Sequence, residues 1–555
     1  MASSRQYLSF VFVIIFLCIS QTCCHYETSQ GNSPLYSQTN SNTSKLKLTS
    51  PTTGAPWPMP QSYNVKPDVN VINVGNFKFV HGKYQCMILD EAFIRYYKLI
   101  FNHNENFRRS SSYKILKFES GITQLEVLVN TPCKDNEYFK LDTDESYNIK
   151  ISKDSAVLNS KTVWGALRGL ETFSQIIYHD KLGQYVVNTT TISDHPRFPH
   201  RGLLLDTSRH FVSKNILLQN LDAMAQNKFN VFHWHIVDDP SFPYESIMFP
   251  ELSQKGAYDP ETHVYTQSDI QEIIEYARLR GIRVVPEFDT PGHTQSWGKA
   301  QTDLLTKCYT KGQPNGQFGP IDPVNNATYT FLQKFFSEIA NVFPDQYIHL
   351  GGDEVSFNCW ASNPAVKEFI KKMGFFFYGQ VEEYYMQKLL DIVGRLGKGY
   401  QIWQEVIDNG AKVRPDTVVE VWKSGWEKEM DKVTKMGYKT LLASCWYLDM
   451  IKLGDWQSFY VCDPFNFPGN ASQKKLIQGG EACLWGEFVD DTNLMSRLWP
   501  RASAVGERLW SNQTVSIPFV AQPRLEEHRC RMVGRGFPAE PATGPGFCKE
   551  EYIHS

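Results

Sequence analysis

The feature that most limits the fold of this chain is a series of eight short apolar runs beginning near residue 200. Each run ends in polar or acidic residues and is followed by a segment with the apolar spacing of an amphipathic helix. Eight such units favour one closed (β/α)8 barrel with insertions, in which chemistry gathers at the carboxyl ends of the strands. The runs are Gly202–Asp206, Val231–Asp238, Arg283–Phe288, Tyr347–Gly351, Gly399–Trp403, Val418–Trp422, Thr440–Ser444 and Gln478–Trp485.

An open doubly wound sheet is the alternative to a barrel. That fold normally carries a glycine-rich phosphate-binding turn after its first strand. Such a turn is missing from this sequence, because Gly202 precedes the first run while Arg209 and His210 follow it. The pattern therefore favours the barrel.

The chain before the barrel has a different pattern. Within residues 61–195, alternating segments such as Gln124–Val129 predict strands, and Val163–Ile177 has the apolar spacing of a helix. We therefore expect an α/β fold, a (β/α)8 TIM barrel over residues 196–555, preceded by a small α+β domain.

The beginning of the chain resembles a targeting sequence. Residues 1–24 contain the apolar stretch Leu8–Ile19 and predict a cleaved signal peptide. A membrane anchor is the alternative, but the stretch is shorter than the roughly 20 residues that a spanning helix needs, and no later segment is suitable. Residues 25–60 are rich in Ser, Thr, Asn, Gln and Pro, which predicts a disordered stalk or propeptide. We expect the protein to enter the secretory pathway.

Cysteines and glycosylation sequons agree with that route. Of twelve cysteines, three lie in or beside the leader, and the nine that remain require at least one free thiol. No CxxC pattern exists, so disulfides are favoured over a zinc site and no metal is expected. By position, three local pairs are Cys86 with Cys133, Cys308 with Cys359, and Cys530 with Cys548. The N-x-S/T sequons begin at Asn42, Asn188, Asn326, Asn470 and Asn512.

The net charge and the composition limit which classes of ligand this protein is expected to bind. The formal net charge is −3 and the chain has no basic block, so neither a nucleic-acid partner nor an anionic membrane surface is indicated. Aromatic residues are abundant, with 13 Trp, 27 Tyr and 35 Phe, which suits a stacking surface but is also ordinary core material.

The residues at the predicted strand ends are mostly carboxylates and indoles. Indole faces stack on sugar rings, carboxylates and arginine bind hydroxyls, and a protonated acid gives a proton to a departing oxygen. A barrel mouth of this composition suits sugar hydrolysis. The residues are Arg209, Asp238, Asp239, Glu287, Asp289, His293, Asp353, Glu354, Trp403, Glu405, Trp422, Trp446, Tyr447, Asp449, Trp485 and Glu487.

Asp353 and Glu354 are the main catalytic candidates. An adjacent acid pair is more often solvated or caps a helix, but this pair follows a strand and two glycines that let the backbone turn tightly into a cleft. Singly, Asp238 is more often a helix cap and His293 a structural loop residue. Together we expect them to form a hydrogen-bonded chain to Glu354, whose pKa burial and a neighbouring carboxylate would raise.

Tryptophan is heavily buried on average, so for any single tryptophan the core is at least an even alternative. That all four, Trp403, Trp422, Trp446 and Trp485, fall at strand ends favours a ligand wall. Glu287 and Glu405 are weaker candidates, interpreted as supporting residues behind the site.

Several motifs in order resemble the family 20 glycoside hydrolases, and more closely the animal lysosomal β-N-acetylhexosaminidases with their α- and β-type subunits. The similarity runs from about residue 56 to the C-terminus. Its motifs are Asp206-Thr207-Ser208-Arg209-His210, Phe232-His233-Trp234-His235-Ile236-Val237-Asp238-Asp239, Glu287-Phe288-Asp289-Thr290-Pro291-Gly292-His293, His349-Leu350-Gly351-Gly352-Asp353-Glu354-Val355, Gly480-Glu481-Ala482-Cys483-Leu484-Trp485-Gly486-Glu487 and Gly546-Phe547-Cys548.

The resemblance implies an exo-acting, retaining enzyme without cofactor, in which the substrate's own 2-acetamido oxygen attacks C1 and forms an oxazolinium ion. It implies that ionised Asp353 orients the acetamido N–H, that Glu354 is first acid and then base, and that Tyr447 donates to the acetamido oxygen. It further implies that Trp403, Trp422 and Trp485 enclose the acetamido methyl group and the sugar ring. Arg209 would bind O3 and O4, and Glu487 would bind O4 and O6.

Further expectations concern subunit type and cysteines. Where the α type has Asn followed by Arg, this chain has Asp449 followed by Met450, which resembles the β type and favours uncharged substrates. Cys445 and Cys462 become further candidates for a disulfide, with Cys483 as the free thiol. The family implies a homodimer or a heterodimer with a related subunit, acting on terminal β-N-acetylhexosaminyl glycans, lysosomal or secreted.

Two alternatives remain. One is a catalytically silent sugar-binding protein on the same fold, which the joint presence of Asp353, Glu354, Tyr447 and Arg209 disfavours. The other is a specialised hexosaminidase that trims N-glycans or chitin oligomers, since loops outside the pocket decide the aglycone. GlcNAc or GalNAc preference stays open.

Overall fold

The computed structural model describes residues 51–101, 121–450 and 454–549, which belong to one compact unit. The predicted signal peptide (1–24), the predicted stalk as far as residue 50, and the sequon at Asn42 lie outside the described residues. Among the helices that are described, none combines the length and the apolar character needed to cross a bilayer.

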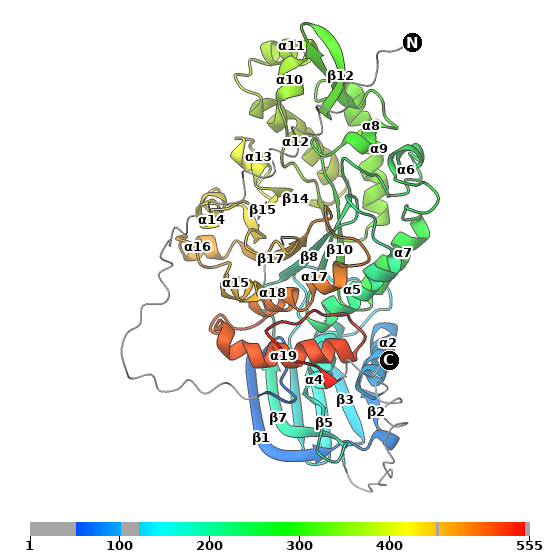
Figure 1. The fold of residues 1–555 in the computed structure, drawn as a ribbon, viewed down its shortest axis with the longest axis vertical. Coiled ribbons are helices and arrows are strands. Elements are labelled where there is room, and N and C mark those ends of the chain that lie inside the picture. Colours follow the sequence, from blue (N-terminus) through cyan, green and yellow to red (C-terminus); the bar gives the residue numbers. More distant parts are fainter. Residues whose placement is uncertain (1–50, 102–120, 451–453, 550–555) are drawn as a thin grey trace, which may run out of the picture. The chain divides into compact units, whose positions relative to one another are not determined.

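Eight parallel strands close into a barrel in the order β10-β13-β14-β15-β16-β17-β8-β9 (Figure 1). Each coincides with one of the eight predicted runs, so the barrel prediction is confirmed. Most of their residues are buried, because helices cover the outside while side chains fill the inside. The strands are β8 (His200–Asp206), β9 (Val231–Val237), β10 (Arg283–Phe288), β13 (Tyr347–His349), β14 (Gly399–Trp403), β15 (Val418–Val421), β16 (Lys439–Leu442) and β17 (Ile477–Leu484).

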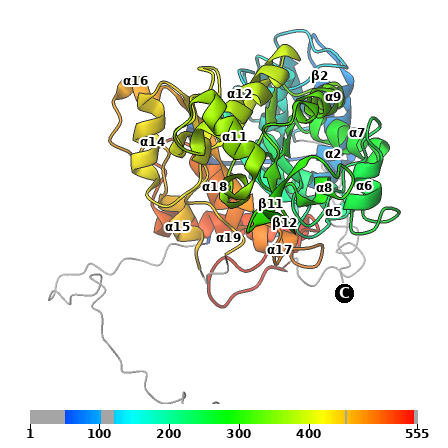
Figure 2. The same ribbon diagram turned by 90° about the horizontal axis from the view of Figure 1, so that it is seen from above.

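Helices surround these strands, with α7 and α9 on one side and α14 and α16 on the opposite side (Figure 2). Phe288 of β10 and Phe335 of α9, with ring centroids 5.1 Å apart, are part of the aromatic packing between the two layers. The helices are α5 (Lys214–Gln226), α6 (Glu251–Gly256), α7 (Gln267–Arg278), α8 (Gln295–Gly298), α9 (Asn326–Val342), α10 (Asn358–Ser362), α11 (Pro364–Met373), α12 (Gly379–Arg395), α13 (Glu405–Asp408), α14 (Trp426–Lys435), α15 (Trp456–Val461), α16 (Ala471–Lys474), α17 (Leu494–Leu498), α18 (Arg501–Trp510) and α19 (Pro518–Gly534).

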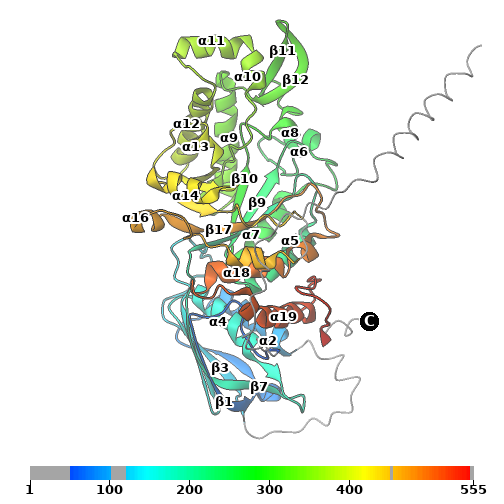
Figure 3. The same cartoon turned by 60° about the vertical axis from the view of Figure 1, so that its left-hand side comes forward.

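The N-terminal domain is a separate α+β layer with its own apolar core, as predicted. Its strands pair in the order β1-β7-β4-β5-β3-β2, with β6 on β7, and the α-helices α2 and α4 lie on one face of the sheet (Figure 3). The elements are β1 (Ser62–Val71), η1 (Val74–Asn76), β2 (Lys78–His81), α2 (Met87–Phe101), β3 (Gln124–Val129), β4 (Tyr147–Ser152), β5 (Ser155–Ser160), α4 (Val163–Ile176), β6 (Tyr178–His179) and β7 (Tyr185–Asp194).

Buried ion pairs join this domain to the barrel. Glu145 Oε2 lies 2.8 Å from Arg168 Nε and 2.6 Å from Arg201 Nη2 at the start of the barrel. Lys228 Nζ lies 3.0 Å from Asp194 Oδ2. Since breaking a buried pair leaves an uncompensated charge, these contacts fix how the two domains meet.

Residues 51–60 do not behave as the predicted stalk. The indole of Trp57 is fully buried, and its Nε1 donates to the carbonyl of Ser503 at 2.9 Å. The backbone N–H groups of Gly54 and Ala55 donate to the carboxylate of Glu527 on α19. The polar composition of 25–60 concealed one large apolar side chain, and burial of that indole attaches this segment to α18 and α19.

The described residues contain four disulfides, and three of them are the pairs predicted by position. Cys483 is buried and free. The disulfides are Cys86–Cys133, Cys308–Cys359, Cys445–Cys462 and Cys530–Cys548.

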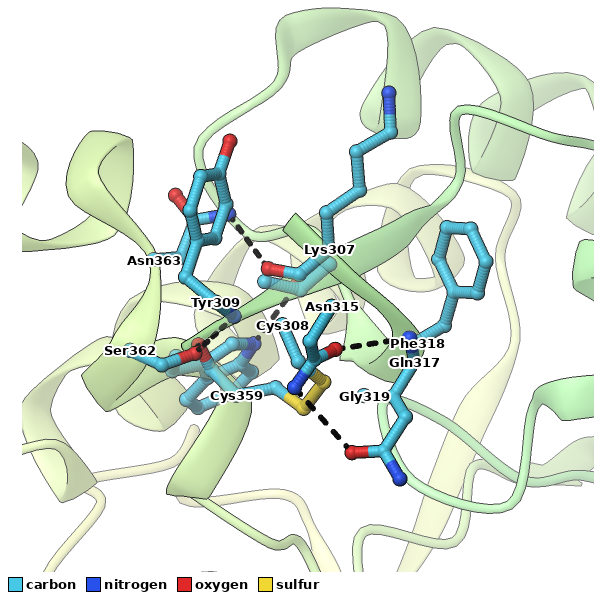
Figure 4. Close-up of a disulfide and its surroundings, with 12 residues drawn as sticks. Lys307, Cys308, Tyr309, Asn315, Gln317, Phe318, Gly319, Cys359, Ser362 and Asn363 are labelled. Carbon is cyan, nitrogen blue, oxygen red and sulfur yellow. Dashed lines mark hydrogen bonds between the residues drawn. A yellow bond between two sulfur atoms is a disulfide. The ribbon is translucent and has the colours of Figure 1, made fainter. Parts of the chain in front are cut away.

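The bond between Cys308 and Cys359 attaches a two-stranded hairpin to α10 (Figure 4). The hairpin strands are β11 (Leu305–Thr310) and β12 (Gln313–Ile321). Asn363 Nδ2 donates to the carbonyl of Lys307 at 3.0 Å beside the same bond. This insertion is therefore fixed covalently as well as by hydrogen bonds.

Candidate active site

A pocket of about 280 Å³ opens at the carboxyl ends of the barrel strands. Ten of the eleven predicted catalytic and substrate-binding residues line it, and the eleventh, Asp238, lies behind Arg209 and His293. Met450 and Phe488 complete the lining. The predicted lining residues are Arg209, His293, Asp353, Glu354, Trp403, Trp422, Tyr447, Asp449, Trp485 and Glu487.

The loop after β13 turns through conformations that favour glycine. Gly351 has φ 68° and Gly352 has φ 94°. A Cβ on Gly351 would lie 1.6 Å from Asp289 Oδ1, and one on Gly352 would lie 2.4 Å from Val406 Cγ2. Only glycine fits at either position, so this loop can pack tightly enough to bring the acid pair into the pocket.

The first acid, Asp353, is buried among ionisable neighbours. Its Oδ2 lies 3.7 Å from His293 Nε2. Burial raises the pKa of Asp353, while the positive charge of His293 and a hydrogen bond from Asp289 oppose the rise. Burial and the charge of Asp353 raise the pKa of Asp289 well above its ordinary value. Of these two neighbouring carboxyls, Asp289 is the one more strongly favoured to hold a proton.

Asp238 lies behind the pocket, and its carboxylate contacts three cationic side chains. Its carboxylate lies 2.7 Å from His235 Nε2, 3.1 Å from His293 Nδ1 and 2.9 Å from Arg209 Nη2. Burial lowers the pKa of His293, but the carboxylates of Asp289, Asp238 and Asp353 outweigh burial and raise it to about 11. His293 is thus a positive charge in the pocket wall.

The second acid, Glu354, is the more exposed of the two, although both carboxylates lie near His293 Nε2. Its side chain is 60 % exposed, and its Oε2 lies 3.6 Å from His293 Nε2, too far for a hydrogen bond. The expectation that burial surrounds Glu354 is therefore wrong in this structure. Glu354 has a left-handed φ of 50°, and its side chain is exposed while that of Asp353 is buried.

Three indoles and a phenol form one wall of the pocket. The ring centroids of Trp403 and Trp485 are 6.0 Å apart, those of Trp485 and Tyr447 6.3 Å, and those of Tyr447 and Trp422 6.1 Å. Burial raises the pKa of Tyr447 well above its ordinary value, so its hydroxyl remains a hydrogen-bond donor. The wall offers flat apolar faces and one polar group.

The fourth strand-end tryptophan does not belong to this wall. Trp446 is fully buried, and its Nε1 donates to the carbonyl of Phe459 at 3.0 Å. Because successive side chains of an extended segment point to opposite sides, Tyr447 faces the pocket and Trp446 faces the core.

Polar groups lie at the other end of the pocket. Arg209 Nη1 donates to Asp206 Oδ2 at 3.0 Å, and its guanidinium lies 5.2 Å from the Trp485 ring centroid. Burial raises the pKa of Asp449 to about 6, and the nearby charge of Glu487 contributes. This end suits hydroxyl groups.

The weaker candidates lie behind the wall and the rim. Glu287 accepts hydrogen bonds from Trp403 Nε1 at 2.8 Å and pairs with His235 Nδ1 at 2.6 Å. Glu405 accepts a hydrogen bond from the backbone of Glu354. Asp289 and Asp206 were not singled out for these supporting contacts, because only the tertiary structure brings them to Asp353 and Arg209.

Several groups of described residues have metal-ligand spacing, and one of them includes the pocket residues His293 and Asp353. Asp289, His293 and Asp353 each offer an atom within 4.8 Å of the others. The three groups already interact with one another, because the carboxyls of Asp289 and Asp353 raise the pKa of His293. The absence of a metal stays a prediction.

A parallel barrel whose open end presents an acid pair, an arginine and an indole wall defines a glycoside hydrolase. Residues 198–513 match the catalytic domain of glycosyl hydrolase family 20, and residues 56–176 match the model described as beta-acetyl hexosaminidase like. The chain belongs to glycosyl hydrolase family 20.

Relatives include both subunit types of animal beta-hexosaminidase. The rat alpha subunit is 50 % identical over 510 residues, covering 90 % of this chain and 96 % of the relative. The cat beta subunit is 52 % identical over 507 residues, covering 89 % and 94 %. Since both types match about equally, identity alone does not distinguish them.

Solved structures share the fold. The Flavobacterium johnsoniae chitobiase is 31 % identical with a TM-score of 0.73, covering 87 % of this chain and 73 % of that chain. An exo-β-N-acetylglucosaminidase of Vibrio harveyi in complex with N-acetylglucosamine has the same TM-score at 24 % identity, covering 89 % and 80 %.

Proposed function

We propose that this chain is an exo-acting, retaining β-N-acetylhexosaminidase that releases terminal β-linked GlcNAc or GalNAc by substrate-assisted catalysis. The observation that carries the proposal is the placement of Asp353 inside, and Glu354 at the rim, of one indole-lined pocket. The similarity to beta-hexosaminidase subunits over most of the chain supports it.

The acetamido group would occupy the indole wall. Its carbonyl oxygen attacks C1 and displaces the leaving oxygen, forming an oxazolinium ion. Asp353 accepts the acetamido N–H and, as a carboxylate, stabilises the positive charge that develops on the ring. Tyr447 donates its hydroxyl to the acetamido oxygen and holds it in line with C1.

Glu354 would transfer protons on the other side of the sugar. In the first step its carboxyl gives a proton to the leaving oxygen as the C1–O bond breaks. In the second step the same carboxylate takes a proton from the water that opens the oxazolinium ring at C1. Two displacements at C1 retain the β configuration.

The polar end would accept only a terminal sugar. Arg209, fixed by Asp206 and Asp238, would bind O3 and O4, while Glu487 and Asp449 would bind O4 and O6. We expect these charged side chains to close around the hydroxyls at this end, which would leave no space for a further sugar beyond them.

Substrate charge and assembly follow from the same resemblance. Asp449 repels an anion and Met450 offers it no hydrogen bond, so uncharged substrates are preferred, as in the β type. We also propose that the chain forms a homodimer or pairs with a related subunit. The predicted compartment is the lysosome or the extracellular space.

Hydrolysis of a chromogenic β-GlcNAc glycoside tests the proposal. We expect turnover by the native chain and its loss in Glu354→Gln, with little change in binding. A native protein that binds the glycoside without cleaving it would instead support the silent sugar-binding alternative.

A further inference from the structure

The backbone of the acid-pair loop is held by carboxylates from two neighbouring strand ends. Asp289 Oδ1 accepts a hydrogen bond from Gly352 N–H at 2.9 Å, and Glu405 Oε2 accepts one from Glu354 N–H at 3.0 Å. Glu354 has a left-handed φ of 50°, which is unfavourable for a residue with a Cβ and persists only where its surroundings fix it. Glu405 supplies one such restraint.

Glu405 is itself fixed by a cation. Its side chain is 12 % exposed, and its Oε1 pairs with the ammonium group of Lys423. Lys423 follows β15, where its backbone N–H donates to Gln404 Oε1 at 2.9 Å, and its Nζ lies 5.4 Å from the Trp422 ring centroid. The barrel wall thus connects to the backbone of Glu354 through one ion pair.

Among the described residues, the Glu354 side chain has only a long ion pair with His293 and accepts no hydrogen bond. It is mostly exposed, and its carboxylate lies 3.6 Å from His293. The backbone contact with Glu405 therefore largely decides where the carboxyl of Glu354 stands relative to the pocket.

We propose that Glu405 positions Glu354 for proton transfer through the backbone N–H, and that Lys423 keeps Glu405 in place. This inference rests on the proposed function, in which Glu354 is the proton donor. Glu405 and Lys423 do not line the pocket and are positioning residues. Because a displacement of about 1 Å costs on the order of 100-fold in rate, their loss slows the step that needs the acid.

Leaving groups of different basicity provide the test. With the full-length enzyme, we expect Glu405→Ala to lower kcat/KM, which reports the steps up to departure of the leaving group, about 100-fold on methyl β-N-acetylglucosaminide, whose leaving oxygen needs a proton. On the 4-nitrophenyl glycoside, which leaves with little assistance, the loss in kcat/KM should stay below about fivefold. Glu368→Ala, an exposed glutamate on α11, is the matched control and should change neither rate.

Lys423 gives a second and milder test, which stands even if Glu405→Ala does not fold. Lys423→Met should show the same dependence on the leaving group at about tenfold, and Lys423→Arg should restore the rate because it keeps the ion pair. Equal losses on both glycosides, or a change confined to KM, would overturn the inference.

A double variant separates this inference from the proposed function. If Glu405 acts through Glu354, then adding Glu405→Ala to Glu354→Gln causes no further loss on the methyl glycoside, on which Glu405→Ala alone costs about 100-fold. A further loss as large as in the native background means that Glu405 acts elsewhere. Full activity of Glu354→Gln alone contradicts the proposed function, and with it this inference.

Discussion

The floor and the rim of the pocket are built in opposite ways. On the floor, Asp353, Asp289 and Asp238 are buried and held by charged partners, so their positions are set before a substrate arrives. At the rim, Glu354 is mostly exposed and held chiefly through its backbone. The floor suits stabilisation of charge, whereas the rim suits an acid that must also reach water.

The largest expected effect is at the rim. Glu354→Gln should lower kcat on methyl β-N-acetylglucosaminide by about 10³- to 10⁴-fold, near the upper range of general acid catalysis, with KM little changed. Steady-state kinetics on glycosides of graded leaving-group basicity checks this. A loss that is the same for every leaving group would mean that Glu354 is not the acid.

A substitution of Asp353 on the floor should lower the rate to an extent that depends on the acetamido group of the substrate and not on its leaving group. Asp353→Asn keeps the size of the side chain but removes its charge, so we expect kcat to fall by about 10²- to 10³-fold on N-acetyl substrates. The comparison uses the matched glucoside, which has a hydroxyl in place of the acetamido group. Equal losses on the two substrates would contradict a role for Asp353 at the acetamido group.

Substitutions behind the floor and at the rim should also differ in how much they lower the free energy of unfolding. Glu287→Gln disrupts a buried group that pairs with His235 and bonds Trp403, so the free energy of unfolding should fall by about 3–5 kcal/mol. Glu405→Gln, at the partly exposed rim, should cost about 1 kcal/mol or less. Urea unfolding measures both, and similar costs would abolish the contrast between floor and rim.

The smallest expected effect is on how the free energy of unfolding depends on pH. The pKa of His293 is raised to about 11, so the folded state binds this proton more tightly than the unfolded chain does. Its contribution to stability is fully present below about pH 6.5 and is lost as pH rises toward 11. Between pH 7 and 9, the free energy of unfolding should therefore fall more steeply in the native protein than in His293→Asn. Identical slopes would mean that His293 is not protonated in the fold.

The sequence predicted the barrel well because each strand is a buried apolar run, and such runs do not depend on distant contacts to be seen. It also placed Asp353 and Glu354 together in the pocket, since two glycines before an acid pair indicate a tight turn, while their catalytic roles stay a prediction. Residues 51–60 were misjudged because composition averages over a segment, while the buried indole of Trp57 alone fixes its place.

It was harder to predict from the sequence which way each side chain points and which distant residues come into contact. Trp446 and Tyr447 are adjacent, yet only the tyrosine faces the pocket, and proximity to a strand end does not decide which side a residue faces. The outward turn of Glu354 and its restraint by Glu405 depend on residues 51 positions apart in sequence. No local pattern carries that information.

The central claim is that the substrate's own amide oxygen performs the displacement. Rates on 4-nitrophenyl glycosides whose N-acetyl group carries zero, one, two or three fluorines test it most directly, because each fluorine makes the oxygen less nucleophilic. The account predicts that kcat/KM falls steeply with every fluorine added, and rates that do not change across the series would contradict it.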